Sequence, residues 1–176
     1  MTFNTSNSLG VNLGGIYAAV STSTPEIPAL PFKIGTHVLG NDGSEWIFAT
    51  AGGVINQYEV VMIDSAFAAL SIVGGSGAEA NQKIVGFYQN STALAATDSA
   101  WFMIRGKPTI NVLGSCAKDV QLYTTNTSGA LDDATTTGSQ FPVFGVTLTT
   151  TIGGTASSNV AVAMFPTVGQ KGQVIT

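Results

Sequence analysis

Residues 100–133 read AWFMIRGKPTINVLGSCAKDVQLYTTNTSGALDD, and this stretch decides the class of fold. It contains two apolar runs, WFMI at 101–104 and TINVL at 109–113, followed by an alternating run, VQLYT at 120–124. The polar turn NTSG at 126–129 then leads the chain back to a pair of aspartates. Short runs of β-branched and aromatic residues between Gly, Asn and Ser residues are typical of short antiparallel strands. The stretch therefore predicts a β scaffold.

The same pattern continues on both sides of this stretch. Residues 36–39 and 44–48 flank the turn GNDG at 40–43, where Asp-Gly supplies the positive φ that a tight hairpin requires. No long segment has the 3.6-residue periodicity of a helix. We therefore expect an all-β fold, namely a small antiparallel barrel or sandwich of short strands with an extended N-terminal arm. Further strands are expected at residues 59–64, 67–72, 84–88, 144–148 and 160–165.

The beginning of the chain differs in composition from the rest, and we expect an extended N-terminal arm at 1–33 in front of a β-barrel or sandwich domain at 34–176. Prolines at every third position, from 25 to 31, fix φ and favour an extended path. Such an arm can dock into a groove of a neighbouring subunit or add a strand to an exposed sheet edge. A frayed tail is the alternative, although disordered tails usually lack apolar clusters. The residues expected to make the contact are Ile16, Tyr17, Val20, Pro25, Pro28 and Phe32.

A weak internal repeat relates two parts of the chain, at about 54–106 and 114–166. The apolar block that begins at Trp101 has a counterpart at Val160, and Gly86 has a counterpart at Gly145, so the offset is 59 residues in both cases. A true duplication would give each half a hairpin, a strand centred on a glycine and a closing strand, with one shared core. Because identity between the two parts is low, chance similarity of β patterns is the alternative.

The low charge of the chain limits its partners. Charged residues make up 9% of the chain, against roughly 25% in an ordinary soluble domain. Six basic and ten acidic residues give a net charge of -4, which argues against nucleic acid because no phosphate backbone would be neutralised. Thr, Ser, Asn and Gln supply polarity instead, which suits surfaces covered by another protein, where a buried unpaired charge is costly. A weakly charged monomer is the alternative.

A membrane is not an expected partner either. The most apolar region, 60–73, is interrupted by Asp64 and Ser65 and is shorter than the ~18 residues that a membrane span requires. Residues 1–4 do not begin a secretory signal, because no basic start precedes an apolar core. We expect a protein that is made in the cytoplasm.

The sequence contains no visible catalytic or metal-binding constellation, so neither enzymatic activity nor a cofactor is expected. His37 is the only histidine and Cys116 the only cysteine, which is too few for a structural zinc site. We expect Cys116 to be a small buried apolar residue. Asp132 and Asp133 are expected at the solvated end of a hairpin, with acid–base or cation-binding chemistry as the weaker alternative.

Arg105 and Lys107 form the one basic spot inside the predicted β core. A solvated turn is the simple interpretation of this spot. The alternative is a basic pair at an interface, where both side chains meet carboxylates of a partner.

The block at 100–112, followed by LYTT at 122–125, GALDD at 129–133 and FGV at 144–146, resembles the small capsid decoration (head cement) proteins of tailed bacteriophages. The resemblance covers roughly residues 54–165 and leaves the arm uncovered. It implies a protein that binds the outside of an assembled capsid, with the major capsid protein as its partner, and cements neighbouring capsomers. It also implies self-association, often as a homotrimer. The expected location is the outer capsid surface of the virion, after synthesis in the host cytoplasm.

A second function, from another class, is a glycan- or receptor-binding β module of a phage fibre or adhesin. Exposed aromatic side chains such as Trp46 or Tyr58, aligned on one face with Asn and Asp residues, would favour it. An enzyme is the third and weakest hypothesis.

Overall fold

The computed structural model describes residues 11–18, 30–74, 83–134 and 140–169. The all-β class is confirmed, because this part of the chain contains strands and turns but no helix. It accordingly offers no helix of the length and apolarity needed to cross a membrane. The strands are β1 Ile16–Tyr17, β2 His37–Leu39, β3 Glu45–Ala51, β4 Val60–Ile63, β5 Ala68–Ser71, β6 Ile84–Phe87, β7 Ser99–Gly106, β8 Thr109–Val112, β9 Leu122–Thr124, β10 Ala130–Asp132, β11 Pro142–Leu148 and β12 Ser157–Val168.

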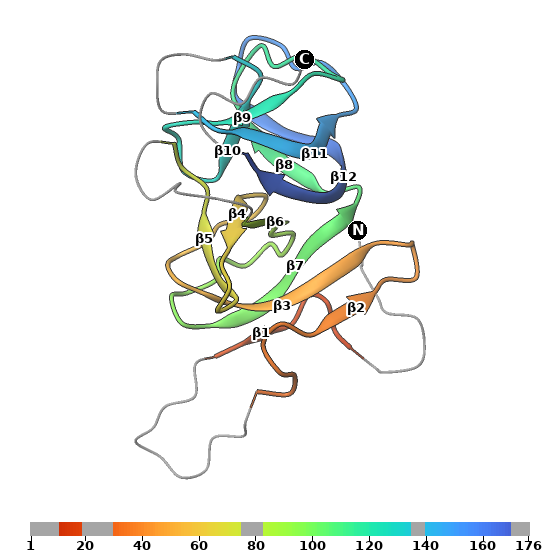
Figure 1. Cartoon of the computed structure of the whole chain (residues 1–176), viewed down its shortest axis with the longest axis vertical. Helices are drawn as coiled ribbons and strands as arrows, with labels where there is room; N and C mark the ends of the chain where they lie inside the picture. Colours follow the sequence, from red (N-terminus) through yellow and green to blue (C-terminus); the bar gives the residue numbers. More distant parts are fainter. Residues whose placement is uncertain (1–10, 19–29, 75–82, 135–139, 170–176) are drawn as a thin grey trace.

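The strands form two closed rings, which lie one above the other in Figure 1. In the first ring, which we call the first barrel, β3 pairs with β5, β5 with β4, β4 with β6, β6 with β7, and β7 again with β3. In the second barrel, β8 pairs with β10, β10 with β9, β9 with β11, β11 with β12, and β12 again with β8. The order of pairing is therefore the same in both barrels.

Each barrel also contains one parallel pair of strands, which the sequence-based expectation of an antiparallel fold did not include. The pairs β3–β5 and β8–β10 are parallel, while the other pairs within each ring are antiparallel. In each ring the strand that comes between the two parallel strands along the chain, β4 or β9, pairs antiparallel with the second of them, β5 or β10. The sheet is thus mixed and not fully antiparallel.

The register of the strands relates the barrels residue by residue. Ala49 pairs with Ala100 in the first barrel, and Ile110 pairs with Asn159 at the same place in the second. Ala100 and Asn159 are 59 residues apart, which is the offset of the weak repeat in the sequence. Each structural unit begins one strand earlier than the sequence repeat at 54–106 and 114–166, because β3 and β8 complete the rings.

Alternate residues fill the interior of each barrel, as the two-residue period of a strand requires. In the first barrel Ala49 and Phe102 belong to the interior cluster and are fully buried. Their counterparts in the second barrel are Ile110 and Ala161, which are also fully buried. The larger of the two side chains therefore comes from β7 in the first barrel and from β8 in the second.

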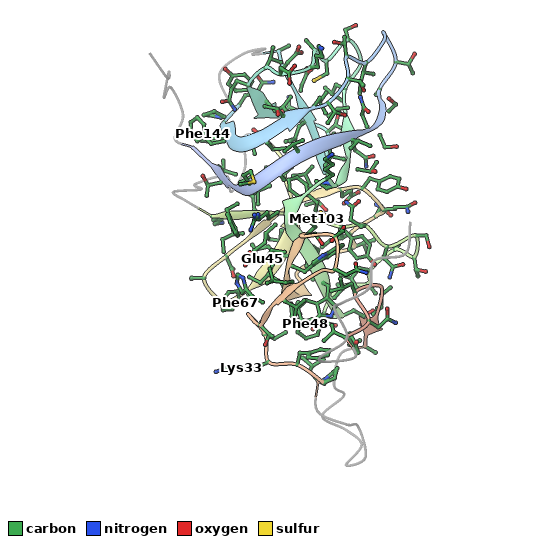
Figure 2. The ribbon with its side chains drawn as sticks, turned by 90° about the vertical axis from the view of Figure 1, so that its right-hand side faces the viewer. Lys33, Glu45, Phe48, Phe67, Met103 and Phe144 are labelled. Atoms are coloured by element: carbon green, nitrogen blue, oxygen red, sulfur yellow. The ribbon has the colours of Figure 1, made fainter. Side chains whose placement is uncertain are left out.

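Aromatic side chains cover the outside of the first barrel. Phe48 and Trp101 point outward from β3 and β7, and their ring centroids lie 5.0 Å apart. Phe32 packs on Trp101 with a centroid distance of 5.1 Å, and Tyr17 packs on Phe48 at 5.5 Å. Figure 2 shows Phe48 near the end of the molecule that carries β1 and β2. Edge-to-face contacts of this kind add to the burial of the rings, so Tyr17 and Phe32 of the arm pack against the core.

The fold makes the interior of the first barrel sensitive to truncation. We expect Phe102→Ala to lower the free energy of unfolding by about 3–5 kcal/mol, because loss of the fully buried ring leaves a cavity beside Ile47, its partner on β3. The matched control is Leu70→Ala, whose side chain is 51% exposed and should change the free energy by less than about 1 kcal/mol. Urea unfolding followed by tryptophan fluorescence measures both. Similar losses for the two variants would contradict the assigned interior.

Candidate binding groove between the two barrels

A groove of about 880 Å³ lies where the two barrels meet. Its walls come from both barrels and from the N-terminal segment, so residues far apart in sequence share one concave surface. The pairing of β7 with β12, through Arg105 and Met164, joins the barrels at this place. The lining residues used below are Asp42, Tyr58, Gln89, Asn90, Arg105, Lys107, Val160, Val162 and Met164.

One wall of the groove is an apolar stripe on β12. Val160, Val162 and Met164 are 40%, 38% and 56% exposed, whereas Ala161 and Ala163 between them are fully buried. This alternation places the three larger side chains on the outer face of the second barrel and the alanines in its interior. We call Val160, Val162 and Met164 the β12 stripe. Contiguous exposed apolar side chains are typical of sites that another molecule covers.

The predicted basic pair lies in the same groove. Arg105 and Lys107 both line it, beside the β12 stripe. The guanidinium carbon of Arg105 lies 5.9 Å from the centre of the Phe165 ring, which is within the range of a cation–π contact. Among the described residues neither cation forms an ion pair with a carboxylate. The groove therefore presents two cations next to an apolar stripe.

Asp42 is the one acidic residue of the groove lining, and its carboxylate is already in use. Its Oδ1 accepts hydrogen bonds from the backbone N–H of Ser44 at 3.0 Å and from the Ser44 hydroxyl at 2.6 Å. Burial alone would raise the pKa of Asp42, but these hydrogen bonds outweigh it and hold the pKa below its usual value. Asp42 is ionised at neutral pH and stabilises the turn between β2 and β3, which was predicted from its Asp-Gly pair.

Amide side chains of the groove hold its walls together. Gln89 Nε2 donates to the carbonyl of Thr109 at 2.8 Å, and Gln89 Oε1 accepts from the Thr109 N–H at 3.0 Å. Asn90 Nδ2 donates to the carbonyl of Gly14, which ties the N-terminal segment to the rim of the groove. Because these groups are bonded within the chain, the shape of the groove is fixed before any ligand binds.

The aromatic residues considered for glycan binding have different positions. Trp46 is 1% exposed, and its indole N–H donates to the Ser44 hydroxyl at 2.7 Å, so its ring is not an exposed platform. Tyr58 is half-buried and lines the groove, with a φ of 65° at its backbone. Only one of the two rings is therefore placed to meet a ligand.

The predicted contact residues of the arm lie partly within the described residues. Ile16 and Tyr17 form β1 and pair with Ala100 and Ser99 of the same chain. Phe32 packs against the aromatic cluster on the first barrel. Val20, Pro25 and Pro28 lie outside the described residues. The contacts of the described arm residues are thus intramolecular, and contact of the arm with a partner stays a prediction.

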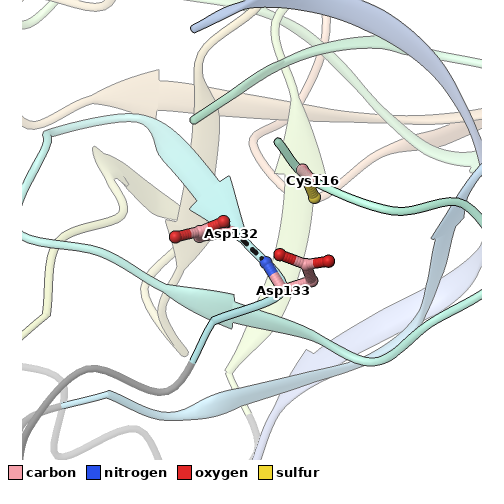
Figure 3. Close-up of side chains that lie close together, drawn as sticks. All are labelled: Cys116, Asp132 and Asp133. Carbon is pink, nitrogen blue, oxygen red and sulfur yellow. Dashed lines mark hydrogen bonds between the residues drawn. The ribbon is translucent and has the colours of Figure 1, made fainter. Parts of the chain in front are cut away.

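Cys116, Asp132 and Asp133 lie close together in the second barrel, with one potential ligand atom from each within 4.8 Å of the others (Figure 3). The Asp133 N–H donates to Asp132 Oδ1 at 2.9 Å, and Asp133 Oδ2 accepts from the N–H of Ala117 at 2.7 Å. The expectation of a solvated hairpin end is wrong for Asp132, which is only 9% exposed, because β10 closes the barrel and does not project from it.

The chemistry of this cluster indicates that Cys116 is a buried core side chain and not a reactive or metal-binding group. Burial, together with the negative charge of Asp133, raises the pKa of the Cys116 thiol to about 11. A thiol with such a pKa is protonated at neutral pH and is a poor nucleophile and a poor metal ligand. The carbonyl of Cys116 accepts from the Ile152 N–H as the carbonyl of Ile55 accepts from the Leu94 N–H in the first barrel, and both residues are fully buried. It is a small buried side chain, as the sequence predicted.

No protein-family model and no curated protein sequence matches this chain. The function therefore has to be inferred from its residues and from the groove. Sequence reasoning found Arg105 and Lys107 from their charge but missed the β12 stripe. The available signal was the offset of 59 residues, which places Val160 on β12 at the position of Trp101 on β7. The face of β7 at this position is covered, whereas the face of β12 is open.

The buried position of Cys116 predicts that its thiol reacts slowly with thiol reagents. At about pH 8 we expect the native protein to react with an aromatic disulfide reagent at least about 100-fold more slowly than the urea-unfolded chain, because burial excludes the reagent and disfavours the thiolate. The released chromophore reports on Cys116 alone, because it is the only cysteine. Fast stoichiometric labelling of the native protein would contradict this position.

The position of Asp132 predicts a pH-dependent stability. Burial raises the pKa of Asp132 in the folded state, so the folded chain holds this proton more tightly than the unfolded chain, whose pKa is about 4. Stability is therefore lost as the pH rises through the folded value. We expect Asp132→Asn, which keeps the acceptor for the Asp133 N–H, to be more stable than the wild type at pH 7. The gain should vanish near pH 3, where the carboxyl is protonated in both states. An equal gain at both pH values in urea titrations would contradict this assignment.

Proposed function

We propose that this chain is a non-enzymatic structural protein of a tailed bacteriophage, which decorates and stabilises the outer surface of the capsid by binding the lattice of the major capsid protein. The resemblance of residues 100–112 and the segments that follow them to head decoration proteins supports this function. The two compact β barrels and their exposed apolar side chains are compatible with it. In this role the protein is made in the host cytoplasm and resides on the virion.

The observation that carries the proposal is the surface of the molecule. Sixteen charged residues in 176 leave a weakly charged exterior on which large apolar side chains are exposed. Contacts between proteins deplete charge at their centre and gain free energy from buried apolar area. Within the part of the chain that the structure describes, the exposed large apolar side chains are Leu39, Val54, Leu70, Val120, Val160, Val162, Met164 and Phe165.

Attachment to a lattice compensates for weak individual contacts. A decoration protein meets many equivalent sites on a capsid, and linkage of its copies makes the second contact intramolecular. Self-association as a homotrimer, which the resemblance implies, would supply that linkage at positions of local threefold symmetry. A weakly charged protein can then attach to the capsid through many weak contacts, without one high-affinity site.

A glycan-binding module is the second candidate, and one observation favours it. Tyr58, Asn90 and Asp42 line one groove, so an aromatic ring lies close to polar groups of the kind that hold sugars. Trp46, however, is buried and adds nothing to such a surface. Binding to a glycan array that is lost on Tyr58→Ala would favour this function over decoration.

Particles test the decoration function directly. We expect mass spectrometry of purified virions to find the protein in a copy number that is a large fraction of the number of capsid subunits. Particles made without it should release DNA at a lower temperature, because they lack the contacts that link capsomers. Wild-type protein added back to such particles is the control and should restore the release temperature. Presence only at the tail tip, or absence from particles, would refute the function.

A further inference from the structure

The equivalence of the barrels shows that one face is covered in the first and open in the second. Trp101 and Met103 point outward from β7 and are 1% and 0% exposed. Their counterparts on β12 at the 59-residue offset are Val160 and Val162, which are 40% and 38% exposed. Both faces are apolar. The two faces differ in whether other residues of the chain cover them.

Non-helical segments of the chain near its N-terminus cover part of this face of the first barrel. Phe32 lies on Trp101 with a centroid distance of 5.1 Å. Val11 and Leu13, from the residues just before β1, are buried in the same cluster. The described part of the arm has no helix and reaches the barrel through turns, bends and the two-residue strand β1. The first barrel thus shows which kind of ligand such a face accepts.

At Ser158 and Asn159 the edge of β12 has its hydrogen bonds satisfied without an added strand. The outer face of β12, in contrast, remains exposed. In the first barrel β1 pairs with Ser99 and Ala100, whose counterparts are Ser158 and Asn159. There the Asn159 side chain satisfies the edge itself, because Oδ1 accepts from the N–H of Val160 at 2.8 Å and Nδ2 donates to the carbonyl of Thr150 at 3.1 Å. A ligand of this region would therefore contact side chains and not add a strand.

The charges beside the stripe define the ligand further. Arg105 and Lys107 line the groove next to Val162 and Met164 and have no carboxylate partner among the described residues. Asp42, the acidic residue of the lining, is hydrogen-bonded to Ser44. A carboxylate brought by a ligand would gain charge-assisted hydrogen bonds from two cations in a partly desolvated groove.

We propose that the groove and the β12 stripe bind an extended segment of a partner protein, with apolar side chains on Val160, Val162 and Met164 and a carboxylate at Arg105 and Lys107. The identity of that partner as the major capsid protein rests on the proposed function. The chemistry of the segment rests on the groove alone. The occupant lies on the outer face of β12 as Phe32 lies on Trp101 of β7, but without the strand pairing that β1 makes with β7.

Random-peptide display against the intact protein tests this inference. We expect selection to enrich 12-residue peptides in which apolar residues accompany at least one Asp or Glu. Binding of a selected peptide, measured by fluorescence polarisation, should weaken at least 10-fold in Val162→Asp and also in Arg105→Gln. The control is Leu70→Asp, because Leu70 is 51% exposed and does not line the groove. Circular dichroism and thermal melting verify that each variant is folded.

The outcomes separate the inference from the proposed function. Failure to enrich any peptide, or equal binding by Val162→Asp and Leu70→Asp, overturns the groove as a peptide site. Enrichment of peptides without acidic residues contradicts the carboxylate contact, and the proposal as stated then fails. If Arg105→Gln alone binds as the wild type does, the carboxylate is wrong and the proposal fails in that form. Peptide binding by a protein that is absent from virions refutes capsid decoration and leaves the groove site intact. Full occupancy of virions by Val162→Asp refutes the groove as the capsid contact.

Discussion

Closure of each strand ring is the constraint on which the rest of the structure depends. β7 and β12 each pair on both sides, and only this double pairing converts five short strands into a barrel with an enclosed interior. Once a ring is closed, every second side chain must fit a fixed interior volume. The exchange of Ala49 and Phe102 for Ile110 and Ala161 meets this requirement with different residues. The same alternation fixes which side chains face outward, and so it creates both the aromatic face of the first barrel and the stripe on β12.

The two barrels have the same pairing order but different surroundings. Aromatic residues on the outside of the first barrel bind the N-terminal segment, whereas smaller aliphatic residues on the second remain exposed at the groove. Where the barrels meet, Arg105 contributes its backbone to the pairing with Met164 and its side chain to the groove. One of the contacts that hold the barrels together is therefore also the place where a partner is expected.

Local patterns predicted the strands well and their partners poorly. Alternation and turn residues located every strand from β2 to β12, including the hairpin around the Asp-Gly turn, because strand formation leaves a two-residue period in the sequence. The parallel pairs and the closure of two rings depend on contacts between distant residues, which no local period records. The same reason explains the error at Asp132, since only the pairing of β10 with β8 buries it. In the groove, Arg105 and Lys107 were found by their charge, but the exposure of Val162 depends on what covers β12.

The position of β12 in the chain order has a consequence for biosynthesis. All five strands of the first barrel precede residue 107, so this ring can close while translation of the second half continues. The second ring lacks its closing strand until residues 157–168 have left the ribosome. β12 then completes the second ring and pairs with β7 and β6 of the first at the same time. β12, the last strand to leave the ribosome, thus adds to contacts between the two halves that residues before it already make, such as the hydrogen bond from the Val60 N–H to the carbonyl of Gly129 at 2.9 Å.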